Sequence, residues 1–152
     1  MYNSELWTLN KKLENVIDVF QRKLLRLILN RFYPKTISNV ALYKVTKQTA
    51  WTSVIKMRRI RWAGHMLRLD PETPCNRALT IYRTHKGKLK RGNHSTWINQ
   101  MNRDLRSVGV VGVDGTIWDT GVRTLAQERA TWRRVVQSTV RCGVSQETME
   151  QR

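Results

Sequence analysis

The stretch that decides the fold is WTSVIKMRRIRWAGHMLRL, residues 51–69. With successive side chains about 100° apart on a helix, its apolar residues fall on one stripe and its basic residues on a second stripe beside it. Thr49 is a suitable N-cap before it, and Pro71 stops it. The spacing therefore predicts a helix with one packing face and one cationic face. The apolar positions are Trp51, Ile55, Trp62, Met66 and Leu69, and the basic positions are Arg58, Arg61, His65 and Arg68.

The N-terminal part repeats apolar residues at spacings of three and four between positions 6 and 28. This spacing predicts a long amphipathic helix with a single apolar stripe. Ser4 is the expected N-cap, and Pro34 follows the end of the helix. A short helix is predicted at about 38–45, beginning after Ser38.

The remainder of the chain adds further helical signals, so the expected fold class is all-α. We expect an irregular bundle of five or six helices around a Trp/Leu/Val core, with a basic loop and at most one short strand. The expected parts are an N-terminal helical part at 1–48, a basic helical part at 49–141 and a frayed tail at 142–152. The later helices are predicted at about 75–82 after Pro74, at 97–107 after Ser95 or Thr96, and at 121–140, while the glycine-interrupted stretch 108–115 is a loop or the strand.

The charge of the chain points to a polyanionic partner. Its 152 residues carry 28 Lys+Arg against 11 Asp+Glu, a net charge of +17. Between Asp18 and Asp70 there are 12 basic residues and no acid. RNA and DNA are the expected partners, because Lys and Arg release counterions condensed on phosphates. A membrane surface is the weaker option. No apolar run approaches the length of a transmembrane helix, and the N-terminus lacks the apolar region of a secretory signal. We expect a cytoplasmic and nuclear protein with no membrane and no small-molecule substrate.

Two basic segments are candidates for phosphate contact. Arginine suits phosphate because its planar fork is bidentate and keeps its charge. The alternatives are a solvated face for the helix, and a nuclear-localisation signal or a solvated loop for the second segment. The absence of nearby acids favours phosphate contact. The predicted nucleic-acid-binding residues are Arg58, Arg61, His65 and Arg68 on the helix, and Arg83, Lys86, Lys88, Lys90 and Arg91 in a flexible basic loop.

Catalytic and metal-binding motifs do not emerge from the sequence. His65, Cys75, His85 and His94 lie nine or more residues apart, whereas zinc ligands come in close pairs. We expect both cysteines to be reduced thiols, small buried side chains rather than ligands. The five Asp are scattered, and two-metal chemistry needs clustered carboxylates. We therefore expect no catalytic residues, no metal site and no cofactor in this chain.

The six tryptophans divide into two groups. Trp51, Trp62, Trp97 and Trp132 lie on apolar stripes and are expected in the core. Trp7 and Trp118 lie on no stripe, so they could instead stack on unpaired bases.

Several strings, taken in order, resemble the region after the palm in endonuclease-reverse transcriptases of non-LTR retrotransposons, LINE-like elements of the RTE kind. The resemblance covers nearly the whole chain, and RRIRWAGHMLR is its most specific string. One departure is Gly92-Asn93-His94, where the family usually has Gly-Arg-Pro before its Thr/Ser-Trp. The strings are SELWTL at 4–9, IDVFQRKLLR at 17–26, ISN at 37–39, RRIRWAGHMLR at 58–68, KLKRG at 88–92, TW at 96–97 and ATWRR at 130–134.

The resemblance implies that this chain is the thumb and C-terminal extension of a larger polyprotein, with 1–48 as the thumb-like part. Such a polyprotein is an RNA-directed DNA polymerase and endonuclease, and its palm would need Mg²⁺. The implied function here is to grip template–primer nucleic acid, with RNA or DNA and the rest of the reverse transcriptase as partners. The alternatives are an inactive truncated transposon copy and a standalone basic RNA-binding helical protein.

Overall fold

The computed structural model describes residues 2–84, 96–110, 116–117 and 119–149, without the side chains of 82–84 and 140–149. These residues form helices and no strand, which confirms the all-α expectation. There are seven α-helices within the described part, because Glu128 has extended backbone and divides the helix predicted at 121–140 into two. The elements are the 3-10 helix η1 (Ser4–Leu6), α1 (Lys11–Ile28), α2 (Asn39–Thr46), α3 (Trp51–Arg68), α4 (Pro74–Thr84), α5 (Trp97–Ser107), α6 (Thr120–Gln127) and α7 (Arg129–Met149).

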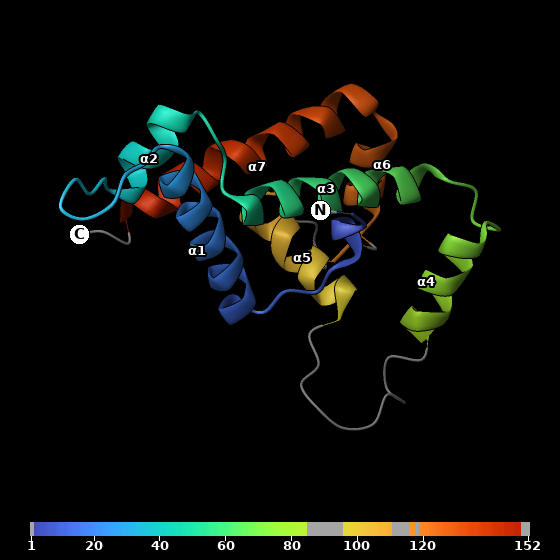
Figure 1. Cartoon of the computed structure of the whole chain (residues 1–152). Coiled ribbons are helices and arrows are strands. Elements are labelled where there is room, and N and C mark those ends of the chain that lie inside the picture. Colours follow the sequence, from blue (N-terminus) through green and yellow to red (C-terminus); the bar gives the residue numbers. More distant parts are fainter. Residues whose placement is uncertain (1, 85–95, 111–115, 118, 150–152) are drawn as a thin grey trace.

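Helix α3 is the central element of the molecule. It contacts η1, α1, α4, α5, α6 and α7, whereas α2 packs on α1 (Figure 1). Helix α7 runs along α3, and α4 extends away from the other helices (Figure 1). The stretch with the strongest sequence signal therefore becomes the element around which the others assemble.

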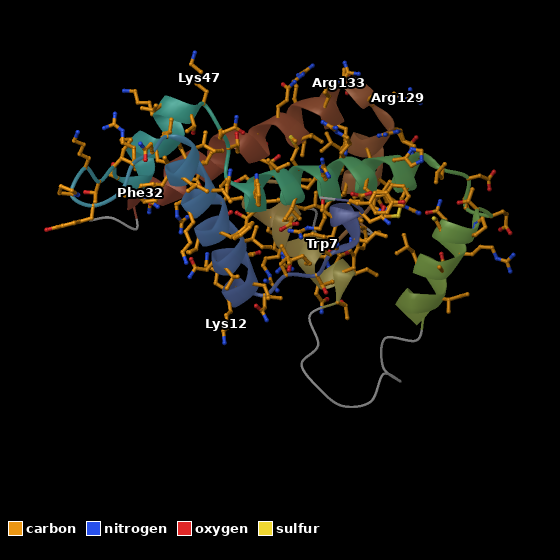
Figure 2. All side chains as sticks on the ribbon, in the orientation of Figure 1. Trp7, Lys12, Phe32, Lys47, Arg129 and Arg133 are labelled. Carbon is orange, nitrogen blue, oxygen red and sulfur yellow. The ribbon has the colours of Figure 1, made fainter. Side chains whose placement is uncertain are left out.

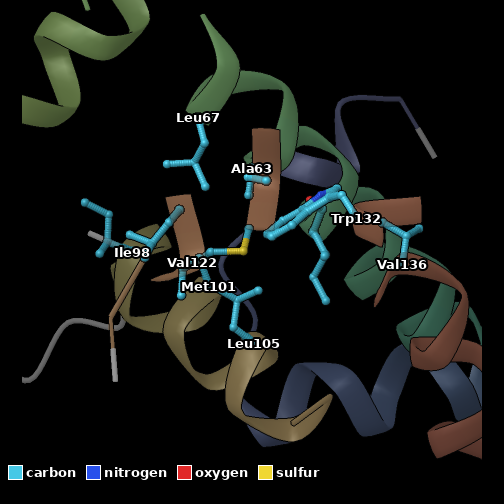
Figure 3. Packing of buried hydrophobic residues seen from close by; sticks show 11 residues of the cluster. Ala63, Leu67, Ile98, Met101, Leu105, Val122, Trp132 and Val136 are labelled. Atoms are coloured by element: carbon cyan, nitrogen blue, oxygen red, sulfur yellow. The ribbon is translucent and has the colours of Figure 1, made fainter. Parts of the chain in front are cut away.

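The core is built where α3, α5, α6 and α7 meet (Figure 3). Its one fully buried tryptophan among the described residues is Trp132, whose Nε1 donates a hydrogen bond to the carbonyl of Ile60 over 3.0 Å. Trp97 is half-buried and packs against this cluster, whereas Trp51 and Trp62 are half-buried outside it, so the core expectation is wrong for these two. Aliphatic side chains and Met101 fill the volume instead. The buried cluster is Ile60, Ala63, Leu67, Ile98, Met101, Leu105, Ile117, Val122, Ala126, Trp132 and Val136.

A buried ion pair fixes α5 against α3. Arg59 is 1% exposed, and its Nε donates to the Asp104 carboxylate over 2.7 Å. Its Nη1 donates to the carbonyl of Trp7, and the side-chain amide of Gln100 donates to the second carboxylate oxygen. One arginine of the RRIR string is thus part of the interior rather than of the surface.

Helix α1 leaves much of its apolar stripe exposed to solvent. Val16, Phe20 and Leu27 are 56%, 54% and 62% exposed, whereas Gln21 is only 2% exposed. The side chains of Asp18 and Gln21 reach α3 instead. Amphipathic periodicity predicts a stripe but not the direction in which the stripe faces, and here the polar side contacts the fold.

The inward polar side chains of α1 cap the first turn of α3. Gln21 Oε1 accepts a hydrogen bond from the Trp51 amide over 2.7 Å, and its Nε2 donates to the Thr49 carbonyl over 2.9 Å. Asp18 accepts from the amide and the hydroxyl of Thr52. Free amides at a helix start need acceptors, and here a distant helix supplies them. The prediction of Thr49 as the cap is therefore wrong, because the N-cap position is Ala50 and has no side-chain acceptor.

Local caps account for the other helix starts that were predicted correctly. Ser38 accepts from the Ala41 amide and begins α2, and Thr96 accepts from the Asn99 amide and begins α5. Ser4 is not the cap of the first long helix, because the side chain of Asn10 fills that position. The non-helical segment 7–10, between η1 and α1, interrupts the single long helix that periodicity alone predicts.

A Gln21→Ala variant is expected to lose about 1–3 kcal/mol of unfolding free energy, since it leaves the Trp51 amide and the Thr49 carbonyl without partners. Leu27→Ala is the matched control on the exposed stripe of the same helix, and it should stay within about 0.5 kcal/mol of the parent chain. Urea denaturation followed by circular dichroism measures both. A larger loss for Leu27→Ala than for Gln21→Ala would contradict this orientation of α1.

Candidate nucleic-acid interface

The predicted basic stripe of α3 is divided by the structure. Arg61 and His65 are exposed, as the prediction requires. Arg58 is half-buried and donates through Nη1 to the Ser4 hydroxyl over 3.2 Å. Arg68 is also half-buried and donates through Nη1 to the Ala126 carbonyl over 2.8 Å. The middle of the stripe therefore faces solvent, while its two ends are tied to η1 and α6.

The charge of Arg129 on α7 acts on Arg68 at the end of α3. Partial burial, and then the like charge of Arg129, lower the pKa of the Arg68 guanidinium from its ordinary value. Arg129 is exposed at the start of α7. The Arg68 guanidinium remains a cation despite this lowering, because an arginine keeps its charge in proteins. The meeting point of α3 and α7 thus concentrates positive charge.

Helix α7 adds exposed arginines that the sequence interpretation did not include. Arg129, Arg133 and Arg134 are exposed, and Figure 2 shows Arg129 and Arg133 projecting from the outer side of α7. The available signal was the absence of any acid from 129 to 146. We use the name α3/α7 cationic surface for the exposed arginines that these two packed helices carry, which are Arg61, Arg129, Arg133 and Arg134.

Helix α4 extends into the segment predicted as a basic loop. Helix α4 continues to Thr84, so Arg83 belongs to a helix and not to a loop, although its side chain is not described. Lys86, Lys88, Lys90 and Arg91 lie outside the described residues. The structure therefore places only the α3 half of the predicted site.

Aromatic side chains accompany the cations on α3. The rings of Trp62 and His65 are stacked, with centroids 5.5 Å apart and planes inclined by 30°. Trp62 had been expected in the core, but it is half-buried and lies beside an exposed histidine. Trp7 is 40% exposed, as its position off the apolar stripes suggested, and Trp118 lies outside the described residues.

The described aspartates have structural partners. Asp104 pairs with Arg59, Asp18 caps α3, and Asp119 accepts a hydrogen bond from the Gly121 amide at the start of α6. Asp70 accepts a hydrogen bond from the Glu72 amide in the turn before α4. In the described part of the chain, no three His, Cys, Asp or Glu side chains gather where they could hold a metal ion.

Cys75 departs from its expected environment. Its side chain is a free thiol exposed on α4, so the expectation of a buried cysteine is wrong at this position. The first turn of α4 is held by Asn76, whose side-chain amide donates to the carbonyls of Leu69 and Asp70. Asn76 therefore occupies the buried position, and its neighbour Cys75 faces solvent.

Comparison with known proteins found no matching family model, no matching curated protein and no matching solved structure. Within the described residues, every helix is too short or too polar to cross a lipid bilayer.

Proposed function

We propose that this chain is a nucleic-acid-binding segment of a non-LTR retrotransposon reverse transcriptase. It grips template–primer through phosphate contacts, in the cytoplasm and nucleus, as part of a larger RNA-directed DNA polymerase and endonuclease. Catalysis by that enzyme, with its Mg²⁺, belongs to domains outside this chain. The retrotransposon assignment rests on the ordered strings of the sequence, and the binding function rests on the surface described above.

The observation that carries the binding proposal is the pairing of α3 with α7. The two helices pack together, and neither has an acid between 51 and 68 or between 129 and 146. An ordinary solvated helix mixes the two signs, often as i,i+4 pairs. Here cations are added by both helices, and a phosphate backbone is the partner that offsets such a concentration of charge.

Binding should weaken steeply as salt is raised. Each phosphate contact contributes about −0.9 to the slope of log K against log salt on duplex DNA, so several contacts give a slope of several units. Fluorescence anisotropy with a labelled RNA–DNA hybrid measures this slope directly. A slope near zero, or the absence of binding at low salt, would contradict the proposed function.

Matched triple variants locate the contact. Changing Arg61, Arg129 and Arg133 to Ala should make the slope of log K against log salt less negative by up to about three units. Changing the exposed Lys12, Lys23 and Lys47 to Ala removes the same charge from α1 and the end of α2, and should have a smaller effect. Equal losses in the two triples would mean that total charge, and not the α3/α7 cationic surface, determines binding.

A further inference from the structure

The stacked pair on α3 is built from consecutive turns of one helix. Trp62 and His65 are three residues apart, which places them on the same side of α3. Their rings stack while His65 remains exposed, so the pair presents an aromatic surface to solvent. Arg61, which is exposed, immediately precedes Trp62 in the chain.

The polar edge of Trp62 is available to a ligand. Trp132 donates its indole N–H to Ile60, and Trp97 donates its indole N–H to the Glu5 carbonyl over 2.7 Å. The indole N–H of Trp62 has no such partner among the described residues. In the described part of the chain, this half-buried tryptophan outside the core cluster therefore keeps an indole donor without a protein acceptor.

An exposed tryptophan, Trp7, belongs to the segment packed beside this turn of α3. Arg58 donates to Ser4, and Arg59 donates to the carbonyl of Trp7, so residues 4–7 lie along the turn that precedes Trp62. Trp7 itself lies next to η1 and is 40% exposed (Figure 2).

We propose that Trp62 and His65 form a stacking site for unpaired bases, so that the chain prefers single-stranded RNA or DNA to duplex. Stacking on an aromatic side chain contributes about 1–3 kcal/mol per base and tolerates every base, because each has a π-face. Duplex hides those faces, so only a single strand can use both the rings and the neighbouring Arg61. The inference rests on the proposed function and specifies the part of the nucleic acid that this site holds.

The test compares three probes of equal length and label on the full chain: an oligothymidylate, the same backbone with abasic sites throughout, and a duplex. The parent chain should bind the oligothymidylate about tenfold more tightly than the abasic strand, as expected for one stacked base. A Trp62→Leu, His65→Ala variant should narrow that ratio to about twofold, whereas Arg61→Ala should weaken all three probes together.

Equal affinity of the parent chain for thymidylate and abasic strands overturns the stacking site while leaving phosphate binding intact. If the parent chain binds none of the three probes, the proposed function itself is overturned. The probe comparison needs only the parent chain, so it remains decisive even if the double variant loses helix by circular dichroism. A folded double variant that keeps the full preference for bases also rejects this site.

Discussion

An Asp104→Ala variant is expected to lose about 3–5 kcal/mol of unfolding free energy, because the Arg59 guanidinium would remain buried without its counter-ion. The two side chains are 2% and 6% exposed, so water cannot replace the carboxylate. The loss also frees the side-chain amide of Gln100, whose donor now reaches Asp104. Guanidinium denaturation followed by far-UV circular dichroism measures the change.

Two further variants test whether the loss of stability comes from the buried, unpaired charge of Arg59 or from the change in net charge alone. Arg103→Ala removes a neighbouring charge that is exposed, and it should change stability by no more than about 0.5 kcal/mol. The double change Arg59→Met, Asp104→Leu should recover most of the loss, since an apolar pair of similar volume often replaces a buried ion pair at little cost. A single Asp104→Ala change that costs under about 1 kcal/mol would show that Arg59 can reach solvent.

Gly64→Ala is the second change with a large expected effect, and it acts against helix propensity. Alanine favours a helix interior over glycine by about 1 kcal/mol, so an unpacked site would gain stability. A Cβ at Gly64 would lie 2.0 Å from the indole nitrogen of Trp132, so the buried ring must move. Overpacking of this kind costs about 1–3 kcal/mol. After the propensity gain of about 1 kcal/mol, we expect a net loss of up to about 2 kcal/mol.

A double-mutant cycle tests the cause of that loss. In a Trp132→Leu background the ring is absent, so adding Gly64→Ala should cost far less than it does in the parent chain. Thermal denaturation of all four proteins gives the coupling energy. Additive effects would mean that Gly64 is required for its backbone and not for the space it leaves to Trp132.

Helices could be predicted from sequence wherever the signal is local. The cap Ser38 and the cap Thr96 mark the starts of α2 and α5, and the periodicity of 51–69 marks α3. A cap hydrogen bond and a helical period both act within one or two turns of the chain. The break at Glu128 was missed because neither glycine nor proline marks it.

The candidate site was predicted only in part. Arg61 and His65 are exposed on the predicted stripe, but Arg58 and Arg68 are hydrogen-bonded to η1 and α6. The exposed arginines of α7 were not included, because their proximity to α3 depends on how two segments sixty residues or more apart pack together. Periodicity places residues on a side of their own helix and says nothing about its neighbours.

By itself the sequence determined the all-α class, the positions of most helices along the chain and the large positive charge. These properties depend on composition and on interactions within a few residues. Only the tertiary structure decided which stripe of α1 faces inward and which arginine of the RRIR string is buried. Asp104 is 45 residues from Arg59, and Gln21 is 30 residues from the Trp51 amide that it caps. Such pairs form only when packing brings distant segments together, because burial makes an unpaired charge or amide costly and selects the arrangement in which each has a partner.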